Sequence, residues 1–297
     1  MSRIYVVGAV NIDISGTPDT AFLAGDSNPG RVILSAGGVG RNIAENLRYL
    51  GHDVELVTLL GEDPYSDMIR GNCRQIGIGL SLARVIPGGH TSTYLCVNDE
   101  SGNVAAAIAD MKIYERMTPA LLAPVTGELN KADLVVLDAN LPETAIAFLC
   151  EQLTVPVFAD PVSAKKAVRL RSSVGRLTAV KPNVPEAEVL TGITIRDDRD
   201  LAAAAEYLLS AGVRLVLISL GARGVYAADE RHRGIYPCID SPVINTNGCG
   251  DALLAAAVDA YLRGFDFETA VHRALSAAAV TAGYPGAACP TLRDQLL

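Results

Sequence analysis

Short apolar runs rich in β-branched residues alternate along this chain with segments whose apolar residues recur at helical spacing. Uninterrupted apolar runs of this length are typical of strands buried on both faces of a sheet. The expected strands are residues 4–7, 54–60, 134–137, 155–159, 178–180 and 215–219. The expected helices are residues 43–50, 201–209 and 252–262. Strands that alternate with helices predict an α/β fold built on a mostly parallel sheet.

Two segments interrupt this alternation in the first half of the chain. Residues 11–36 are rich in Ser, Thr, Asp, Gly and Pro. Residues 91–113 hold two strand-like runs around Asn-Asp-Glu-Ser-Gly-Asn at 98–103, which is a hairpin signal. We expect both segments to form a small β lid, inserted as about residues 12–36 and 90–113 into a single domain that takes in all 297 residues.

The composition fits a folded protein that acts on a small molecule. Hydrophobic residues make up 49% of the chain, enough for a large core, which excludes a disordered protein. Against 25 Lys and Arg stand 33 Asp and Glu, and a net charge of −8 offers no electrostatic footprint for nucleic acid or an anionic membrane. We therefore expect neither as a partner. Strand alternation at 91–96 leaves one lid face free to meet a second copy of the chain, as in a homodimer.

Several familiar motifs are missing from the sequence. It has no Gly-x-x-x-x-Gly-Lys-[Ser/Thr], residues 38–43 lack the last glycine of a dinucleotide fingerprint, and the four histidines form no His-Glu-x-x-His. These absences argue against a Walker-type ATPase, a typical dehydrogenase and a zincin. The six cysteines form no Cys-x-x-Cys pair, and no apolar targeting segment precedes residue 4, so we expect a cytoplasmic protein.

The strongest local signal is Asn-Thr-Asn-Gly-Cys-Gly-Asp at residues 245–251, which opens an expected helix. Free backbone N–H groups at a helix start, with its partial positive charge, can bind an anion such as a transferring phosphoryl group. Gly248 and Gly250 let that anion approach closely, and Cys249 contributes only its backbone N–H. Asp251 would then face a bound hydroxyl and accept its proton. The alternative is that Asp251 only starts the helix, where the dipole favours an acidic residue.

Two further motifs place polar side chains beside expected secondary structure. Residues 37–42, Gly-Gly-Val-Gly-Arg-Asn, bring backbone near a ligand, and Asn42 both donates and accepts hydrogen bonds, which suits a polyol. Asn183 and Glu186 follow the strand at 178–180, where an amide and a carboxylate can hold hydrated Mg²⁺ and phosphate oxygens. Each motif has a structural alternative, a tight turn with a capping Asn and a capped helix start with proline in its first turn.

In order and spacing, over nearly the whole chain, these motifs resemble the ribokinase-like (PfkB) family of carbohydrate and nucleoside kinases. The shared features are the loop at 37–42, Asn-x-x-Glu at 183–186, Ser-Leu-Gly-Ala-Arg-Gly at 219–224, and Gly-x-Gly-Asp ending at Asp251. The resemblance implies a three-layer α/β/α fold with a β lid over the acceptor. It also implies ATP along the C-terminal strand edges, Mg²⁺, and in-line transfer to a primary hydroxyl.

The resemblance assigns roles to individual residues. Asp251 matches the family's base, and Gly248, Cys249 and Gly250 match its anion hole. The residues that it places at the nucleotide are Asn183, Ser219, Gly221 and Gly224, with Glu186 at the magnesium ion. The residues that it places at the acceptor are Asp13, Gly38 and Asn42.

A closer resemblance narrows the acceptor. Residues 26–30, 37–44, 91–94, 110–111 and 160–164 resemble the pseudouridine kinase subgroup of the family. A C-linked uracil presents ring N–H donors and carbonyl acceptors, so polar lid side chains can read it. The lid residues with such groups are Ser27, Asn28, Thr93 and Asp110. Taken one by one, these residues are equally explained by turn chemistry and solvated hairpin faces.

Some positions depart from the family's pattern. The family usually begins its last motif with Asp-Thr, whose Asp serves a monovalent-cation loop, and Asn245 here removes that charge and argues against activation by K⁺. Sugar kinases of the superfamily often carry an acidic residue at the position of Asn140, so its neutral amide argues against ribose. Cys249 replaces a common Ala. Lys166, near a strand edge, can neutralise phosphate or merely lie on the surface.

The sequence therefore predicts ATP-dependent phosphorylation of the 5′-hydroxyl of pseudouridine. Because lid sequences change more readily than phosphate-binding motifs, a related kinase for another nucleoside or sugar is the first alternative. The second is a ligand-binding sensor that keeps the fold without catalysis, and the intact residues Asp251, Gly248 and Gly250 argue against it.

Overall fold

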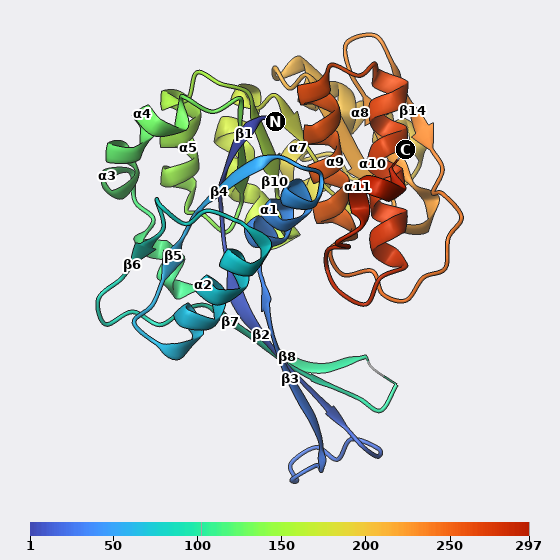
Figure 1. The fold of residues 1–297 in the computed structure, drawn as a ribbon. Helices are drawn as coiled ribbons and strands as arrows, with labels where there is room; N and C mark the ends of the chain where they lie inside the picture. Colours follow the sequence, from blue (N-terminus) through green and yellow to red (C-terminus); the bar gives the residue numbers. More distant parts are fainter. Residues whose placement is uncertain (102, 297) are drawn as a thin grey trace.

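The computed structural model describes residues 1–101 and 103–296, and its body is an α/β structure from which a smaller sheet projects (Figure 1). The central sheet has eight strands in the order β14-β13-β12-β11-β10-β9-β1-β4. Its strands are β1 (Arg3–Val7), β4 (Asp53–Val57), β9 (Leu134–Asp138), β10 (Val157–Asp160), β11 (Ala179–Val180), β12 (Leu215–Ser219), β13 (Val225–Ala228) and β14 (Arg233–Tyr236). All pair in parallel except at the β12–β13 and β13–β14 edge. The expected mostly parallel sheet is confirmed.

Helices cover both faces of this sheet. They are α1 (Val39–Tyr49), α2 (Pro64–Ile76), α3 (Pro119–Leu122), α4 (Thr126–Leu129), α5 (Glu143–Gln152), α6 (Ala164–Ala167), α7 (Val184–Thr191), α8 (Asp198–Ser210), α9 (Cys249–Arg263), α10 (Phe267–Ala282) and α11 (Leu292–Gln295). One apolar core lies between the sheet and α1, α9 and α10, and a second lies between the other face and α5, α7 and α8. Alternate residues of β1 show why: Ile4 and Val6 enter the first core, and Tyr5 and Val7 the second. The three-layer expectation is therefore confirmed.

The expected strand at 54–60 is divided in the structure. Its first part is β4, but β5 (Leu59–Leu60) leaves the central sheet and pairs in parallel with β6 (Arg84–Val85). Apolar residues dominate both parts, so hydropathy alone does not mark the break. Strands β13 and β14, which the sequence reasoning missed, have four residues each and form the antiparallel edge.

The projecting sheet is built from two separate parts of the chain (Figure 1). Its order is β3-β2-β7-β8, with β2 (Asn11–Pro18), β3 (Gly30–Gly37), β7 (Thr93–Asn98) and β8 (Val104–Asp110). Asp13 pairs with Ser35 on β3 and with Tyr94 on β7, so these three side chains share one face. Residue 102, within the expected turn at 98–103, lies outside the described residues. This sheet is called the lid below.

Within the described ranges 1–101 and 103–296, no helix is both long and apolar enough to span a lipid bilayer.

Candidate active site

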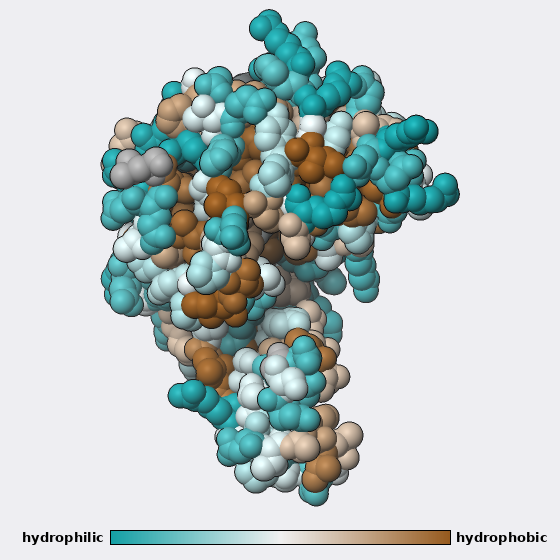
Figure 2. All heavy atoms as spheres, turned by 90° about the vertical axis from the view of Figure 1, so that its right-hand side faces the viewer, coloured by the Kyte–Doolittle hydropathy of each residue, from teal (hydrophilic) through white to brown (hydrophobic). Residues whose placement is uncertain are grey.

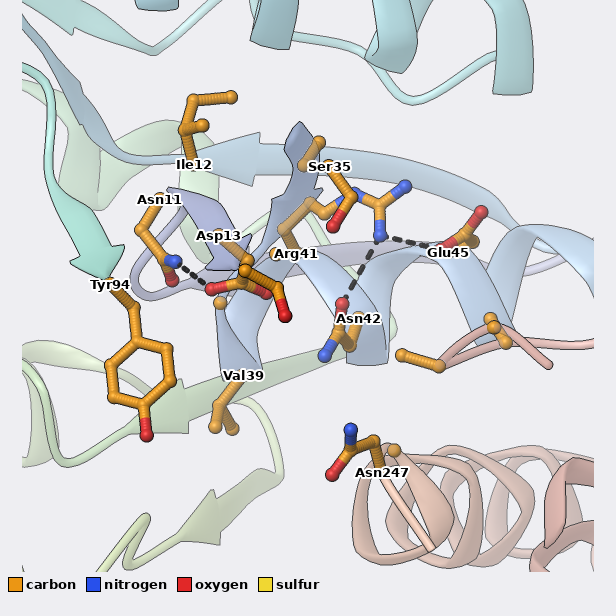
Figure 3. Close-up of a pocket in the computed structure, with 18 of the residues that line it drawn as sticks. Asn11, Ile12, Asp13, Ser35, Val39, Arg41, Asn42, Glu45, Tyr94 and Asn247 are labelled. Carbon is orange, nitrogen blue, oxygen red and sulfur yellow. Dashed lines mark hydrogen bonds and ion pairs between the residues drawn. The ribbon is translucent and has the colours of Figure 1, made fainter. Parts of the chain in front are cut away.

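A large cavity lies where the lid meets the C-terminal edge of the central sheet. It has a volume of about 1210 Å³ and is lined from β2, β3, β7, α1 and the loops beside α9. Figure 3 shows Asp13, Asn42 and Tyr94 around it, with Asn247 on the opposite side. The carboxyl ends of parallel strands are the usual place for a ligand in an open α/β sheet.

Asp251 lies in the first turn of α9, directly behind the cavity wall. It is only 8% exposed, and its Oδ2 accepts a hydrogen bond from Nδ2 of Asn42 at 2.9 Å. Burial raises the pKa of Asp251 to about 7, and the nearby Asp160 carboxylate adds to the rise, whereas Asn42 and Lys181 oppose it. A carboxylate with a pKa close to neutrality is well suited to accept a proton from an alcohol. Because Asn42 lines the cavity, the Asp251 carboxylate is separated from it by one side chain.

The backbone at the start of α9 requires glycine. Gly248 is the N-cap residue with φ of 79°, and a Cβ there would overlap the carbonyl oxygen of Ala287. A Cβ at Gly250 would lie 2.8 Å from Nζ of Lys181. A side chain at position 248 would therefore displace the helix start, whereas at position 250 only the end of a flexible side chain would have to shift. No side chain caps this helix; Asp251 lies in its first turn, as the helix-start alternative also expects, and its side chain turns to Asn42.

An ion pair beside this helix start was missed by the sequence reasoning as a site feature. Nζ of Lys181, at the end of β11, lies 3.1 Å from Oδ2 of Asp160, at the end of β10. Both residues are buried. Burial by itself lowers the pKa of Lys181, but Asp160, Glu186 and Asp251 raise it overall, so the amine stays protonated. Both residues directly follow expected strands. Because the carboxyl ends of parallel strands lie at the same edge of a sheet, the sequence could have predicted that these two side chains lie close together.

Asp138 fixes the glycine loop against the central sheet. Its buried carboxylate accepts the backbone N–H groups of Ala9 at 2.7 Å, Gly40 at 2.9 Å and Asn140 at 2.8 Å. A Cβ at Gly40 would lie 2.9 Å from the same carboxylate oxygen. One side chain therefore joins the start of α1, the connection after β1 and the end of β9.

The three residues of the loop and lid that are expected at the acceptor lie together. Asp13, Gly38 and Asn42 all line the cavity. A Cβ at Gly37 would overlap the Asp13 carboxylate, and burial raises the pKa of Asp13. Gly38 has φ of 100°, a conformation that favours glycine. The alternative of a capping Asn is wrong, because α1 begins at Val39 and Asn42 lies inside it.

Asn140 and Lys166 form another wall of the same cavity. Nζ of Lys166 donates to Oδ1 of Asn140 at 2.5 Å. Burial lowers the pKa of Lys166, although Asp138 opposes the change. Lys166 is thus half-buried, and it lies in the wall of the cavity.

Four of the expected acceptor residues are not brought to this cavity. Ser27 and Asn28 lie in the loop between β2 and β3, where the Asn28 amide bonds to the backbone of Leu23. Thr93 and Asp110 pair with each other across β7 and β8, and neither lines the cavity. For Thr93 the physical reason is the alternation of side chains along β7. Tyr94 faces the cavity, so its neighbour Thr93 faces the opposite side of the lid.

The expected nucleotide residues lie on a second, smaller cleft. Asn183, Ser219 and Gly221 line it, and its volume is about 450 Å³. Gly224 closes the turn between β12 and β13, where its carbonyl accepts the N–H of Leu220 at 2.8 Å. The structure therefore groups these residues at one edge of the central sheet.

Asn183 and Glu186 form a reciprocal cap at the start of α7. The Asn183 side chain accepts the N–H of Glu186 at 2.9 Å, and Glu186 Oε2 accepts the N–H of Asn183 at 2.9 Å. With Pro185 in the first turn, this is the capped helix start that the sequence offered as an alternative. Among residues 1–101 and 103–296, no cluster of three His, Cys, Asp or Glu side chains could hold a metal by itself.

Comparisons with known proteins identify similar chains. Residues 1–293 match the model of the pfkB family of carbohydrate kinases. The pseudouridine kinase of Escherichia coli (strain K12) is 35% identical over 271 residues, which cover 91% of this chain and 87% of that protein. A carbohydrate kinase from Agrobacterium tumefaciens superposes with a TM-score of 0.86 at 29% identity, covering 100% of this chain and 97% of that one. The Arabidopsis thaliana ribokinase complexed with ribose and ATP has a TM-score of 0.84 at 22% identity, covering 99% and 98%.

Proposed function

Because this chain belongs to the pfkB family of carbohydrate kinases, we propose that it transfers a phosphoryl group from ATP to the 5′-hydroxyl of pseudouridine. The family and its pseudouridine kinase relative make it a phosphotransferase with an alcohol acceptor. One observation carries the proposed chemistry. Asp251, a buried carboxylate, lies at the start of a helix and contacts Asn42 in the wall of the large cavity.

In the proposed mechanism Asp251 acts as the general base. It accepts the proton of the acceptor hydroxyl as that oxygen bonds to the terminal phosphorus of ATP, and the bond from phosphorus to the leaving ADP oxygen breaks. The backbone N–H groups at Gly248, Cys249 and Gly250 stabilise the negative charge on the migrating group. Lys181 adds a buried positive charge beside Gly250.

Magnesium and potassium enter this proposal differently. Mg²⁺ takes few carboxylates and keeps several waters, so the Asn183–Glu186 edge suits an ion held mainly by ATP phosphates, whose charge it would neutralise. Asn245 is a poor substitute for a cation ligand. Its Oδ1 accepts the N–H of Asn247 at 2.7 Å and its Nδ2 donates to the carbonyl oxygen of Tyr284 at 2.7 Å, so both ends of the neutral amide are already engaged. We therefore do not make K⁺ part of the proposed activity.

Pseudouridine as acceptor is supported by the 35% identical relative and by the shape of the cavity. Beyond Asp13 and Asn42, expected at the sugar, the cavity continues along the lid past Tyr94 and Asn98. An aromatic ring and an amide suit a flat base with N–H and carbonyl groups. In this proposal Tyr94 and Asn98 take the role first expected of Thr93 and Asp110.

A panel of acceptors tests this proposal. We expect kcat/KM to be highest for pseudouridine, roughly tenfold or more above uridine, and lowest for ribose, because a site built around base hydrogen bonds rejects acceptors that lack them. ADP release measured in a coupled assay, with and without each acceptor, gives the values. Ribose as the best acceptor would exclude the nucleoside proposal. Tight binding without turnover would favour the sensor.

We also propose that the lid pairs with a second copy of the chain through its outer face. This face carries Val32, Leu95 and Ile108, which are 64%, 41% and 67% exposed. Figure 2 shows hydrophobic residues on the projecting part of the molecule. An apolar face of this kind can pair with the same face of a second subunit around a twofold axis.

The double variant Leu95→Asp/Ile108→Asp tests this pairing. We expect light scattering to give a dimer for the wild type and a monomer for the variant, because charges at the centre of an apolar interface lose their water. Val168→Asp, which changes an exposed valine outside the lid, should leave the dimer intact. A monomeric wild type would contradict the proposal.

A further inference from the structure

The amide of Asn42 lies between two charged groups of opposite sign. Its Nδ2 donates to Asp251 Oδ2 at 2.9 Å, and its Oδ1 accepts from Nη1 of Arg41 at 3.1 Å. Figure 3 shows the link between Arg41 and Asn42 at the cavity wall. A guanidinium group only donates hydrogen bonds, and a carboxylate only accepts them. The amide therefore satisfies both neighbours in one orientation and neither in the flipped one.

Arg41 is itself held by side chains from two helices. It is 4% exposed, and its Nη1 lies 2.7 Å from Oε2 of Glu45, one turn further along α1. Its Nε and Nη2 both donate to Oδ1 of Asn72 on α2, at 3.2 and 2.8 Å. The planar guanidinium group reaches all these acceptors at once, which a single ammonium group cannot do. The position of Arg41 is therefore well defined before any ligand binds.

We propose that Arg41 is a positioning residue for the base: through the amide of Asn42 it keeps a hydrogen-bond donor directed at Asp251 and so favours the ionised carboxylate. The consequence for catalysis rests on the proposed function. The orientation of the amide does not, because it follows from the hydrogen-bonding chemistry of three side chains.

The donor matters because most of the surroundings of Asp251 oppose its charge. Burial raises its pKa most, and Asp160 on β10 and Asp138 on β9 raise it further, whereas Asn42 on α1 and Lys181 at the end of β11 lower it. Without Arg41, the amide oxygen of Asn42 can turn toward the carboxyl group, which favours its protonated form. Loss of Arg41 should therefore raise the pKa of Asp251.

The variant Arg41→Met tests this inference through the pH dependence of kcat/KM and through a ¹³C NMR titration of the Asp251 carboxyl group, assigned with Asp251→Asn. We expect the acid limb and the titration midpoint to move up by about one pH unit. Activity then falls about tenfold well below neutral pH and recovers in alkali. Arg41→Lys keeps the positive charge but lacks the planar group with several N–H donors, so the titration midpoint of Asp251 should move less.

Arg48→Met is the matched control. Arg48 lies on the same helix and donates to the carbonyl oxygen of His52 at 2.6 Å, but has no hydrogen bond to Asn42. Its loss should leave the acid limb in place. An Arg41→Met enzyme that is slower by the same factor at every pH, with an unmoved carboxyl titration, overturns the inference. If Arg41→Met does not fold, the titration of Arg41→Lys decides in the same way.

The carboxyl titration also separates this inference from the proposed function. A wild-type protein without acceptor-dependent turnover, whose Asp251 titration nevertheless moves in Arg41→Met, removes the kinase activity and leaves the positioning role of Arg41 standing. An active wild type whose Asp251 titration does not move in Arg41→Met keeps the kinase activity and removes the positioning role of Arg41.

Discussion

Replacing Asp251 with asparagine is expected to lower kcat by roughly 10²-fold or more, the scale of general-base catalysis. Asparagine has nearly the same shape and can still accept the hydrogen bond from Asn42, but it cannot take a proton from the acceptor hydroxyl. The measurement is initial-rate ADP release at saturating ATP and acceptor. Undiminished turnover in Asp251→Asn would exclude this residue as the base.

The stability of the same variant distinguishes a catalytic loss from a folding defect. Burial and Asp160 raise the pKa of Asp251, so the native structure disfavours its ionised form at and above neutral pH. A neutral asparagine avoids that cost, and we expect the melting temperature of Asp251→Asn to be unchanged or higher.

Asp259→Asn is the matched control on the same helix. Asp259 is fully buried and contacts His52, Arg263 and Arg273, at 3.0, 2.5 and 3.2 Å. Loss of its charge leaves these partners unpaired and should cost roughly 3 kcal/mol of stability. Because Asp259 is not part of the proposed active site, kcat per folded molecule should be unchanged. The two variants therefore have opposite expected effects on stability and on rate.

Replacing Gly248 with alanine is expected to give the second large loss, a fall in kcat of about 10²-fold. A Cβ at Gly248 would overlap the backbone carbonyl of Ala287, which cannot swing aside as a side-chain end can. The start of α9 must then move, and with it the amides that stabilise the migrating phosphoryl group. These donors act only when they point at the charge that develops in the transition state.

Gly264 at the other end of α9 provides the control. It has φ of 70° against 79° at Gly248, so alanine meets similar backbone strain, about 1 kcal/mol, at either end. At Gly264, however, nothing lies within 4 Å of the added Cβ. Gly264→Ala should lose about that much stability and keep its kcat. Equal rates for the two variants would show that backbone strain alone, and not the position of the amides, sets the effect.

The sequence predicted the order of strands and helices and the main polar positions, because buried parallel strands and glycine loops have strong local patterns. Asp251 and Asn42 were both expected at the site. Their direct contact was not expected, because 209 positions separate them and only the packing of α1 against α9 brings them together.

The lid was harder to predict for a geometrical reason. Alternation on β7 shows that Thr93 and Tyr94 face opposite sides, but it does not say which side holds the cavity. The choice of Thr93 was therefore a choice between two registers, and the structure shows the other one. Lys181 and Asp160 were overlooked for another reason. Asp160 begins the stretch 160–164 and Lys181 precedes Asn183 by two positions, but neither was given a role, because their importance comes from the distance of 3.1 Å between their side chains.

The contacts of Asp138 bear on the thermodynamics of acceptor recognition. Three backbone amides from separate stretches of chain converge on its carboxylate, so the loop at 37–42 takes its shape when the protein folds. A loop that is already ordered loses little conformational freedom when a small molecule arrives. The contacts that the acceptor makes with this half of the cavity can then appear almost in full as affinity, and any large entropic cost of association must come from the mobile acceptor itself or from the lid.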